Sequence, residues 1–362
     1  MAEFENVRLY EPKKRMPHIV AIGGGHGLSA MLRGLKRYTK FITAIVTVAD
    51  DGGGSGMLRE DLGMLPPGDI RNCIMSLANT EPTMQKLLNY RFTEGSLAGQ
   101  SFGNLFLAAM NGISGSFDEA VHRMGDVLAI TGRVLPVTNQ DVRLEAEFHD
   151  GSRVLGESKI FYAKKINNSR IRKVRLVPER PAALPESVRA IREADIVVIG
   201  PGSLYTSIIP NFLVSGIADA VRQSRALKIY VLNIMTQDGE TDGYDADDHV
   251  RAHVRRLGPL NKFAVAVVDH AQNVRFALLA ERDQLPDLRD GERRPCRVAL
   301  RALDGDELCF GADCGADAVK IERAVRQQVD LPVLHAVFHQ RTLGRTDADD
   351  LLQRVIRRAV RA

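Results

Sequence analysis

The stretch from Ile19 to Ser29 reads Ile-Val-Ala-Ile-Gly-Gly-Gly-His-Gly-Leu-Ser, four apolar residues followed by a glycine-rich turn. A second stretch, from Ile42 to Gly56, repeats this design and reads Ile-Thr-Ala-Ile-Val-Thr-Val-Ala-Asp-Asp-Gly-Gly-Gly-Ser-Gly. A short apolar run that stops at glycines is typical of a buried parallel strand ending in a tight turn. The two stretches therefore predict two buried strands, each followed by a glycine-rich loop.

The segment between these loops, Ser29 to Tyr38, carries apolar residues such as Leu32 and Leu35 at helical spacing. Strand, loop, helix, strand and loop in this order open a doubly wound sheet, whose ligands bind beyond the carboxyl ends of the strands. The predicted fold class is therefore α/β, with a Rossmann-like, mainly parallel sheet. Glycine lets backbone N–H groups approach a phosphate closely, and a helix N-terminus favours negative charge. We expect the chain to bind a nucleotide or another phosphate ester.

The first loop fits the dinucleotide fingerprint in the form Gly25-x-Gly27-x-x-Ala30, and Asp50 follows twenty positions later, where a carboxylate would bind ribose hydroxyls. The predicted strand, the helix and the acidic residue all fit the dinucleotide-binding pattern. A ligand-binding loop is therefore favoured over a glycine turn needed only for packing. A nicotinamide-dependent oxidoreductase stays an alternative that fits this loop and leaves the other motifs unexplained. The candidate phosphate-binding residues are Gly23, Gly24, Gly25, Gly27, Gly52, Gly53 and Ser55.

Asp50 and Asp51 stand side by side at the start of the second loop. Adjacent side chains of a strand point to opposite faces, so at most one of the two is expected to face a ligand if the strand continues. The roles open to them are ribose binding, a divalent cation shared with phosphate, or a general base. For one of the pair, capping of the next turn is the favoured interpretation.

Three further motifs have competing interpretations. Arg71, near a predicted helix start at Asp69, could grip a phosphate bidentately, although surface arginines are common. Residues 99–103 match the nucleophile-elbow string, but no strand precedes them, so Ser101 is interpreted as a helix cap. The polar loop 236–244 follows a predicted strand, and a ligand-binding loop and a solvated connection are equally favoured there.

The rest of the chain suggests one large α/β domain with additions. Residues 1–16 form a polar lead-in, and residues 17–280 form the Rossmann-like nucleotide-binding domain. Short alternating apolar and polar runs predict a small antiparallel β insertion at about 142–177. Residues 281–325 are interpreted as an inserted peripheral segment, and residues 326–362 as a C-terminal segment that ends in a helix near 348–360.

Composition narrows the class of function. A net charge of +4 spread over 362 residues, without a dense basic run interleaved with aromatics, disfavours nucleic acid as a partner. Four irregularly spaced cysteines indicate free thiols in a reducing cytoplasm, and their spacing matches no trusted zinc pattern. No stretch approaches the length of a transmembrane helix, so membrane insertion is not expected. A homo-oligomer stays open.

Taken together, these motifs resemble the bacterial gluconeogenesis-factor (YvcK-type) proteins, in the superfamily of 2-phospho-L-lactate transferase (CofD-like). The resemblance covers roughly residues 17–270. It rests on the order and spacing of 23–29, 48–56, 66–72, 103–105, 200–213 and 233–248. The segments 200–207 and 235–244 look like the gluconeogenesis-factor branch rather than the transferase branch.

The resemblance implies binding of UDP-sugars such as UDP-N-acetylglucosamine, and a role in carbon metabolism, cell envelope synthesis and cell shape without an established reaction. The alternative it implies is a magnesium-dependent transferase of a phosphate-linked group, in which Asp50 or Asp51 would hold the metal. The motif matches add ligand-binding candidates, of which the last three are sugar-side or base-side: Asn104, Gly202, Ser203, Tyr205, Asn233 and Asp242.

The sequence also departs from the pattern of this family. His26 stands where threonine is common, Gly54 where serine is common, and Met57 where arginine is common. The last change removes a cationic side chain that would contact phosphate. Beyond about residue 270 the resemblance thins, but 343–348 resembles a family motif centred on Arg345 and linked to UDP-sugar binding. Arg345 is therefore a candidate phosphate contact far from the glycine loops in sequence.

Overall fold

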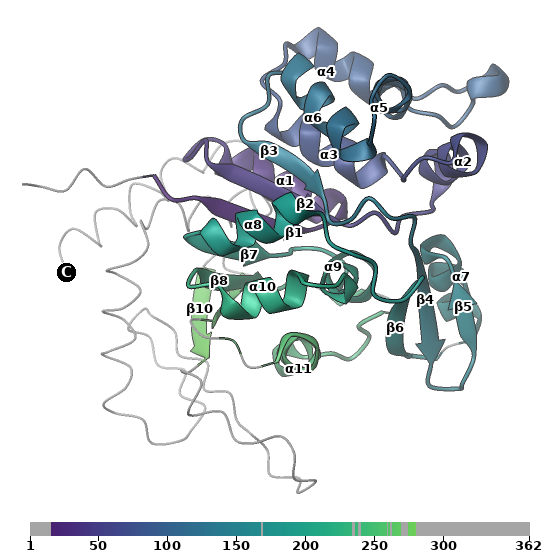
Figure 1. Ribbon diagram of the computed structural model, residues 1–362. Helices are drawn as coiled ribbons and strands as arrows, with labels where there is room; N and C mark the ends of the chain where they lie inside the picture. The colour runs from purple at the N-terminus through teal and green to yellow at the C-terminus, as the bar shows by residue number, and fades with distance from the viewer. Residues whose placement is uncertain are drawn as a thin grey trace, which may run out of the picture.

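The computed structural model describes residues 16–167, 169–233, 236–237, 240–258, 260, 263–268 and 274–279. Seven of the described strands form one sheet in the order β10-β9-β8-β7-β1-β2-β3 (Figure 1). Neighbouring strands are parallel except for the last pair, β9 and β10. The strands are β1 (Ile19–Gly23), β2 (Ile42–Val46), β3 (Arg133–Pro136), β7 (Ile196–Ile199), β8 (Leu227–Val231), β9 (Phe263–Val268) and β10 (Val274–Leu279).

The central strands form because their residues are apolar and, in the case of β1, β2 and β7, mostly β-branched. Every residue of β1, β2, β7 and β8 is buried. Strands covered on both faces read as continuous apolar runs rather than as alternating patterns, which is the signal that the sequence carries at residues 19–22 and 196–199. The predicted parallel, Rossmann-like sheet is confirmed.

The strand order reverses direction at β1. The chain builds β1, β2 and β3 outward on one side and then returns to place β7 directly beside β1, on the other side. Loops that leave β1 and β7 at their carboxyl ends therefore separate and leave a crevice, which is where open α/β sheets bind ligands. This crevice lies beyond residues 23 and 199, where β1 and β7 end.

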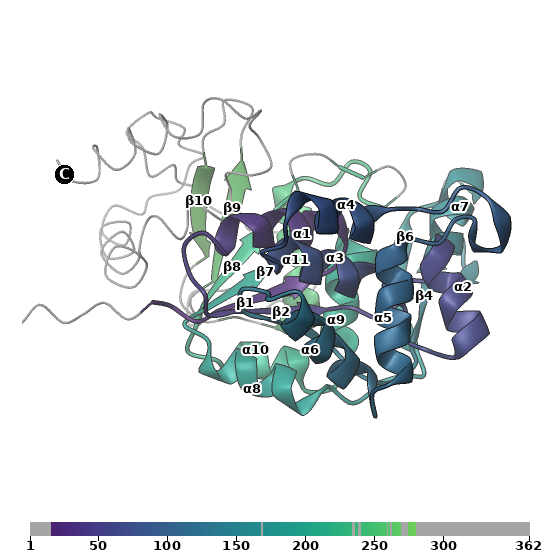
Figure 2. The same ribbon diagram turned by 90° about the horizontal axis from the view of Figure 1, so that it is seen from above.

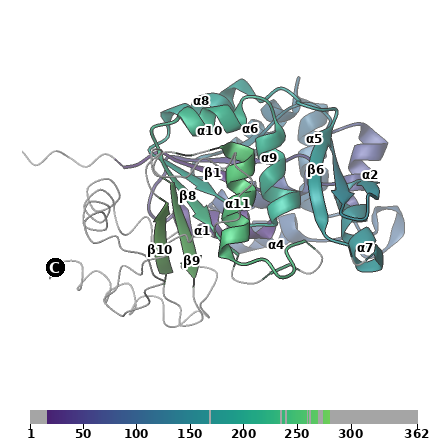
Figure 3. The ribbon, with the colours of Figure 1, turned by 90° about the horizontal axis from the view of Figure 1, so that it is seen from below.

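Helices cover both faces of the sheet. Figure 2 shows α1 and α3 on one face, and α8 and α10 on the opposite face, and Figure 3 shows α1 and the pair α8 and α10 on opposite sides of the sheet from below. Their apolar sides complete the core through residues such as Leu32, Ile74 and Ile191, all fully buried. The helices are α1 (Gly25–Leu35), α2 (Gly53–Leu62), α3 (Gly68–Leu77), α4 (Pro82–Asn89), α5 (Phe102–Gly112), α6 (Phe117–Val127), α8 (Pro185–Glu193), α9 (Ile209–Leu213), α10 (Ile217–Gln223) and α11 (Ala246–Leu257). Two short turns, η1 (Gly95–Leu97) and the π-helical η2 (Leu204–Ile208), complete the set.

The predicted β insertion is present and contains a helix that the pattern did not predict. Its strands β4 (Arg143–Phe148), β5 (Arg153–Leu155) and β6 (Ile171–Val177) form an antiparallel sheet in the order β5-β4-β6. The added helix is α7 (Glu157–Asn167). Apolar residues on both its buried and exposed sides, such as Ile160 and Ile166, blur the helical period and explain the missed prediction.

The N-caps of α5 and α3 test the interpretation of two sequence motifs, the string at 99–103 and the helix start at Asp69. Ser101 caps α5, since its hydroxyl accepts a hydrogen bond from the backbone N–H of Asn104. The string at 99–103 is therefore a helix cap, as predicted, and no strand leads into it. The predicted helix start at Asp69 is corrected: α3 begins at Gly68 with Pro67 at the N-cap, so Asp69 lies in the first turn of the helix. Among the described helices, none has the length and apolar character needed to cross a bilayer.

Candidate functional site

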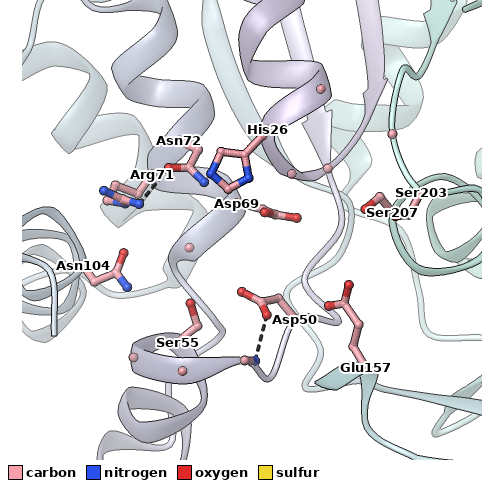
Figure 4. Close-up of a pocket in the computed structure, with 18 of the residues that line it drawn as sticks. His26, Asp50, Ser55, Asp69, Arg71, Asn72, Asn104, Glu157, Ser203 and Ser207 are labelled. Carbon is pink, nitrogen blue, oxygen red and sulfur yellow. Dashed lines mark hydrogen bonds between the residues drawn. The ribbon is translucent and has the colours of Figure 1, made fainter. Parts of the chain in front are cut away.

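A cavity of about 790 Å³ opens at the carboxyl edge of the sheet, where the strand order reverses (Figure 4). The loops after β1, β2, β7 and β8 all contribute to its wall, together with the starts of α3 and α5 and one residue of α7. Its lining residues are Gly24, Gly25, His26, Gly27, Asp50, Gly52, Gly53, Gly54, Ser55, Gly68, Asp69, Arg71, Asn72, Arg91, Asn104, Glu157, Gly202, Ser203, Ser207, Asn233, Thr236 and Gln237. This volume lies within the range of small-molecule sites.

Most of the residues selected from the sequence meet in this cavity. Twelve of the seventeen candidates are lining residues, although they come from segments up to about two hundred positions apart. They are Gly24, Gly25, Gly27, Asp50, Gly52, Gly53, Ser55, Arg71, Asn104, Gly202, Ser203 and Asn233. Their contact with a ligand stays a prediction.

The remaining described candidates are not among the lining residues. Gly23 ends β1, and its carbonyl accepts a hydrogen bond from the side-chain amide of Asn211. The hydroxyl of Tyr205 lies 2.8 Å from that of Tyr244. Asp242 is not among the lining residues. Arg345 lies outside the described residues.

Asp51 holds the insertion in place. Its carboxylate accepts a hydrogen bond of 2.8 Å from the backbone N–H of Ser158, in the first turn of α7, and lies directly against Gly156. A carboxylate that accepts such a hydrogen bond is a helix cap, favoured further by the dipole of α7. The sequence favoured capping of the next turn for one of the two acids, and Asp50 has that contact, with the N–H of Gly52. The cap that Asp51 provides for the distant helix α7 was not predicted.

Replacing Asp51 with alanine is expected to lower the free energy of unfolding by about 1 kcal/mol, the usual cost of a lost cap, with little change in ligand affinity. Chemical denaturation and titration of the same preparations measure both quantities. Asp61→Ala, at an exposed position near the end of α2, is the control. Lost affinity without lost stability would place Asp51 in the binding site instead.

Asp50 is the acid that faces the cavity. One carboxylate oxygen accepts a 2.8 Å hydrogen bond from the backbone N–H of Gly52, and the carboxylate also hydrogen-bonds with the Ser55 hydroxyl. A Cβ at Gly68 would lie 2.9 Å from the other oxygen, so α3 can begin here only with glycine. Burial raises the pKa of Asp50 despite these hydrogen bonds.

Asp69 is a lining residue that the sequence analysis did not select. Its carboxylate hydrogen-bonds with the backbone N–H of Gly25, at the start of α1. A Cβ at Gly24 would lie 2.6 Å from one of its oxygens, so this glycine makes room for an internal carboxylate. Burial, followed by repulsion from Asp50, raises the pKa of Asp69 to about 7.

Glu157 is the second lining residue that was missed. It is the first residue of α7, and its carboxyl group hydrogen-bonds with the Thr206 side chain in the turn after β7. Burial raises its pKa well above the ordinary value, and repulsion from Asp50 and Asp69 adds to this. No signal in the sequence could find it, because it depends on a helix hidden in a β-like pattern about a hundred residues from either glycine loop.

The opposite part of the cavity is basic and amide-rich. Arg71 is buried, one of its terminal nitrogens donates a 2.7 Å hydrogen bond to the Asn72 side chain, and its Nε has no partner. Burial and the nearby charge of Arg91 lower the pKa of Arg71. Asn104 is also buried, and its Oδ1 has no partner. These orphaned groups are the kind that a ligand would satisfy.

The loop after β8 is fastened to the loop after β7. Asn233 donates a 2.7 Å hydrogen bond to the carbonyl of Gly202, and Gln237 donates one of 2.8 Å to the Ser203 hydroxyl. Glu240 accepts from the backbone N–H groups of Tyr205 and Thr206, at 2.8 and 3.0 Å. Asn233, Thr236 and Gln237 of this loop line the cavity, whereas Glu240 and Asp242 do not. A ligand-binding role for the loop stays a prediction.

A magnesium ion would have Asp50, Asp69 and Glu157 as its available carboxylates. Within the described ranges, however, no three histidine, cysteine or acidic side chains are grouped closely enough to hold a metal ion. We therefore derive no chemical step through a metal.

Comparisons with known proteins agree with this architecture. The sequence profile described as 2-phospho-L-lactate transferase CofD matches residues 19–299, which is more than three quarters of the chain. The chain belongs to the CofD family.

Within the CofD family, this chain groups with the gluconeogenesis factors. It is 51% identical to the gluconeogenesis factor of Bacillus subtilis over 243 residues, which cover 67% of this chain and 75% of that protein. A protein of Thermoanaerobacterium thermosulfurigenes that carries the name provisionally is 63% identical over 236 residues, covering 65% of this chain and 73% of that protein. A similarly named relative from Clostridium acetobutylicum, 61% identical, is matched over 67% of this chain and only 54% of its own length.

A solved structure also matches this member of the CofD family. The crystal structure of a UPF0052 family protein from Bacillus halodurans has a TM-score of 0.66 and 47% sequence identity. The match covers 69% of this chain and 80% of that one. The Rossmann-like core is therefore shared at both sequence and structural levels.

Proposed function

We propose that this protein is a cytoplasmic regulator of carbon metabolism, cell envelope synthesis and cell shape, and that it acts by binding a UDP-sugar such as UDP-N-acetylglucosamine. One observation carries the proposal: a large polar cavity at the switch point of the sheet combines two arginines, unpartnered amide and guanidinium atoms, and three carboxyl groups. A nucleotide sugar offers matching chemistry, with phosphate oxygens for the arginines and sugar hydroxyls for the carboxylates.

The relatives support the regulatory part of the proposal. They are named gluconeogenesis factors, although the family profile bears the name of a transferase. A regulator needs only to bind its ligand in the ground state, whereas a transferase must stabilise charge that develops during transfer. The magnesium-dependent transferase is therefore the less favoured function.

A calorimetric titration tests the binding. The purified protein is titrated with UDP-N-acetylglucosamine, GDP and NAD, each with and without magnesium. We expect saturable binding of the UDP-sugar in preference to the other two. Preference for NAD or GDP would overturn the proposed ligand class.

A second experiment separates regulator from enzyme. The protein is incubated with UDP-N-acetylglucosamine, magnesium and cell extract, and the nucleotide is then analysed by chromatography. We expect to recover it intact at the level of a protein-free control. Release of UDP or UMP that disappears in the Asp50→Asn variant would show turnover and reject the regulator.

Arg345 is expected to contribute to this binding. If it pairs with a phosphate, Arg345→Ala should weaken UDP-N-acetylglucosamine binding roughly tenfold to a hundredfold, since a charge-assisted hydrogen bond contributes about 1.5–3 kcal/mol. Arg345→Lys should recover only part of the affinity, because lysine keeps the charge and lacks the planar fork. Equal affinities in all three proteins would confine the site to the loops of the sheet.

A further inference from the structure

Helix N-termini at the carboxyl edge of the sheet are already occupied by the protein's own carboxylates. Asp69 hydrogen-bonds with the N–H of Gly25, at the start of α1. Asp50 accepts from the N–H of Gly52, at the N-cap of α2. Glu240 accepts from both N–H groups that open the π-helical turn after β7. The places where Rossmann folds usually hold phosphate are therefore taken by acidic side chains of the protein itself here.

The dinucleotide fingerprint implies that phosphate binds at the N-terminus of α1. The position of Asp69 at this helix end conflicts with that placement. A phosphate at the N-terminus of α1 would have to displace Asp69 from Gly25 or lie beside its carboxyl group, which repels phosphate at pH values where it is ionised. Gly24 is needed to accommodate Asp69, whose oxygen would lie 2.6 Å from a Cβ at that position. The first glycine loop is thus built around a carboxylate as well as around a cavity.

The positively charged side chains of the cavity lie away from the first glycine loop. In the part of the chain that the structure describes, Arg71 and Arg91 are the arginines that line the cavity, and no lysine joins them. Arg71 is 9% exposed with Nε unpartnered, and Asn104 is 4% exposed with Oδ1 unpartnered. The Nε of Arg71 is therefore an unused donor that an anion can accept from, whereas the Oδ1 of Asn104 is an unused acceptor that would take a hydrogen bond from a ligand hydroxyl or N–H group.

The close-up shows how these groups are separated. In Figure 4, Arg71, Asn72 and Asn104 lie together on one side of the cavity, while Glu157, Ser203 and Ser207 lie on the other. Asp50 and Asp69 lie between the two groups. The cavity thus has a basic end, defined as Arg71, Asn72, Arg91 and Asn104, and an acidic wall, defined as Asp50, Asp69 and Glu157.

We propose that the basic end is the diphosphate subsite and that the acidic wall binds hydroxyl groups of the ligand, so that the phosphates lie away from the first glycine loop. This assignment rests on the proposed function and specifies how that ligand is placed. Carboxylates accept hydrogen bonds from sugar hydroxyls and repel phosphate, while a guanidinium pair does the opposite. The sugar of a bound nucleotide sugar would therefore lie against the acidic wall, and its phosphates at the basic end.

Inorganic pyrophosphate is the probe that tests the subsite without the nucleotide. It is titrated calorimetrically, in EDTA, into the full chain and into Arg91→Gln, at an exposed position that need not disturb the core. We expect at least a tenfold loss of affinity in Arg91→Gln and a similar loss in Arg71→Gln. Arg192→Gln, on α8 and also exposed, is the matched control and should bind like the original protein.

Asp69→Asn separates the two directions of binding. With phosphate at the basic end, this variant changes pyrophosphate affinity less than threefold, and it weakens UDP-N-acetylglucosamine more than UDP. With phosphate at the N-terminus of α1, removal of the carboxylate raises pyrophosphate affinity tenfold or more and Arg91→Gln has no effect. That second pattern, or no binding of pyrophosphate to the original protein, overturns the assignment.

The proposed function can fail independently. If pyrophosphate binding depends on Arg91 but UDP-N-acetylglucosamine does not bind, the anion subsite stands and the nucleotide-sugar function falls. If the UDP-sugar binds equally to the original protein, Arg71→Gln and Arg91→Gln, the function stands and the subsite assignment falls.

Discussion

Gly25→Val is expected to abolish UDP-sugar binding, with a loss of at least a hundredfold. Gly25 lines the cavity, has a φ of +67°, and would place a Cβ 3.7 Å from the Ser207 hydroxyl oxygen. A valine would therefore strain the turn and project its methyl groups across the entrance between the loops after β1 and β7. Calorimetric titration of UDP-N-acetylglucosamine measures the effect.

Gly63→Val is the matched control for this substitution. Gly63 has nearly the same φ, +64°, but it follows the last residue of α2, would give a Cβ no neighbouring atom within 4 Å, and does not line the cavity. Both variants should lose stability by roughly 1–2 kcal/mol from left-handed strain, while only Gly25→Val should lose the ligand. Unchanged affinity in a folded Gly25→Val protein would remove the first glycine loop from the site.

Asp69→Asn is expected to change how stability depends on pH. In the folded protein, the pKa of Asp69 is raised to about 7 from an ordinary value of 3.8, with burial as the main cause. The folded state therefore holds a proton that the unfolded chain releases, and stability falls as pH rises from about 4 to 7. The contribution of this group over that window is roughly 2–4 kcal/mol, which the asparagine variant should no longer show.

Urea denaturation at pH 5 and pH 8, in EDTA, measures the difference. His253 acts in the opposite direction, because burial lowers its pKa to about 3, so the informative quantity is the change in slope between the variant and the original protein. Asp61→Asn, an exposed carboxyl at the end of α2, should leave the slope unaltered. An identical slope in Asp69→Asn would show that this carboxyl ionises freely in the folded state.

Much of the fold could be predicted because the buried parallel strands carry a strong local signal. The apolar runs at 196–199 and 263–268 coincide with β7 and β9, and the helical spacing of apolar residues at 185–193 coincides with α8. The predicted strand from Ile42 to Val48 ends two residues early, at Val46, since its last residues already enter the loop. Helix α7 was missed because its apolar residues do not lie on one side.

The parts of the candidate site formed by glycine-rich loops could be predicted from the sequence. The residues that reach it through packing of distant elements could not. The glycine-rich loops are visible in the sequence, and glycine indicates that the backbone can approach a ligand closely. Asp69 looked like an ordinary cap, and its place at the cavity depends on α3 packing beside α1. Glu157 reaches the cavity only because the insertion contacts the loops after β2 and β7, which no local pattern encodes. Sequence reasoning also could not show that the glycine loops bind carboxylates of the protein itself.

The measurement that tests the central claim most directly is a crystal structure of this chain with UDP-N-acetylglucosamine. We predict an intact nucleotide sugar in the cavity at the switch point, with its diphosphate against Arg71 and Arg91 and sugar hydroxyls on Asp50, Asp69 or Glu157. Density for the ligand outside this cavity, or a cavity that stays empty at saturating ligand, would contradict the account.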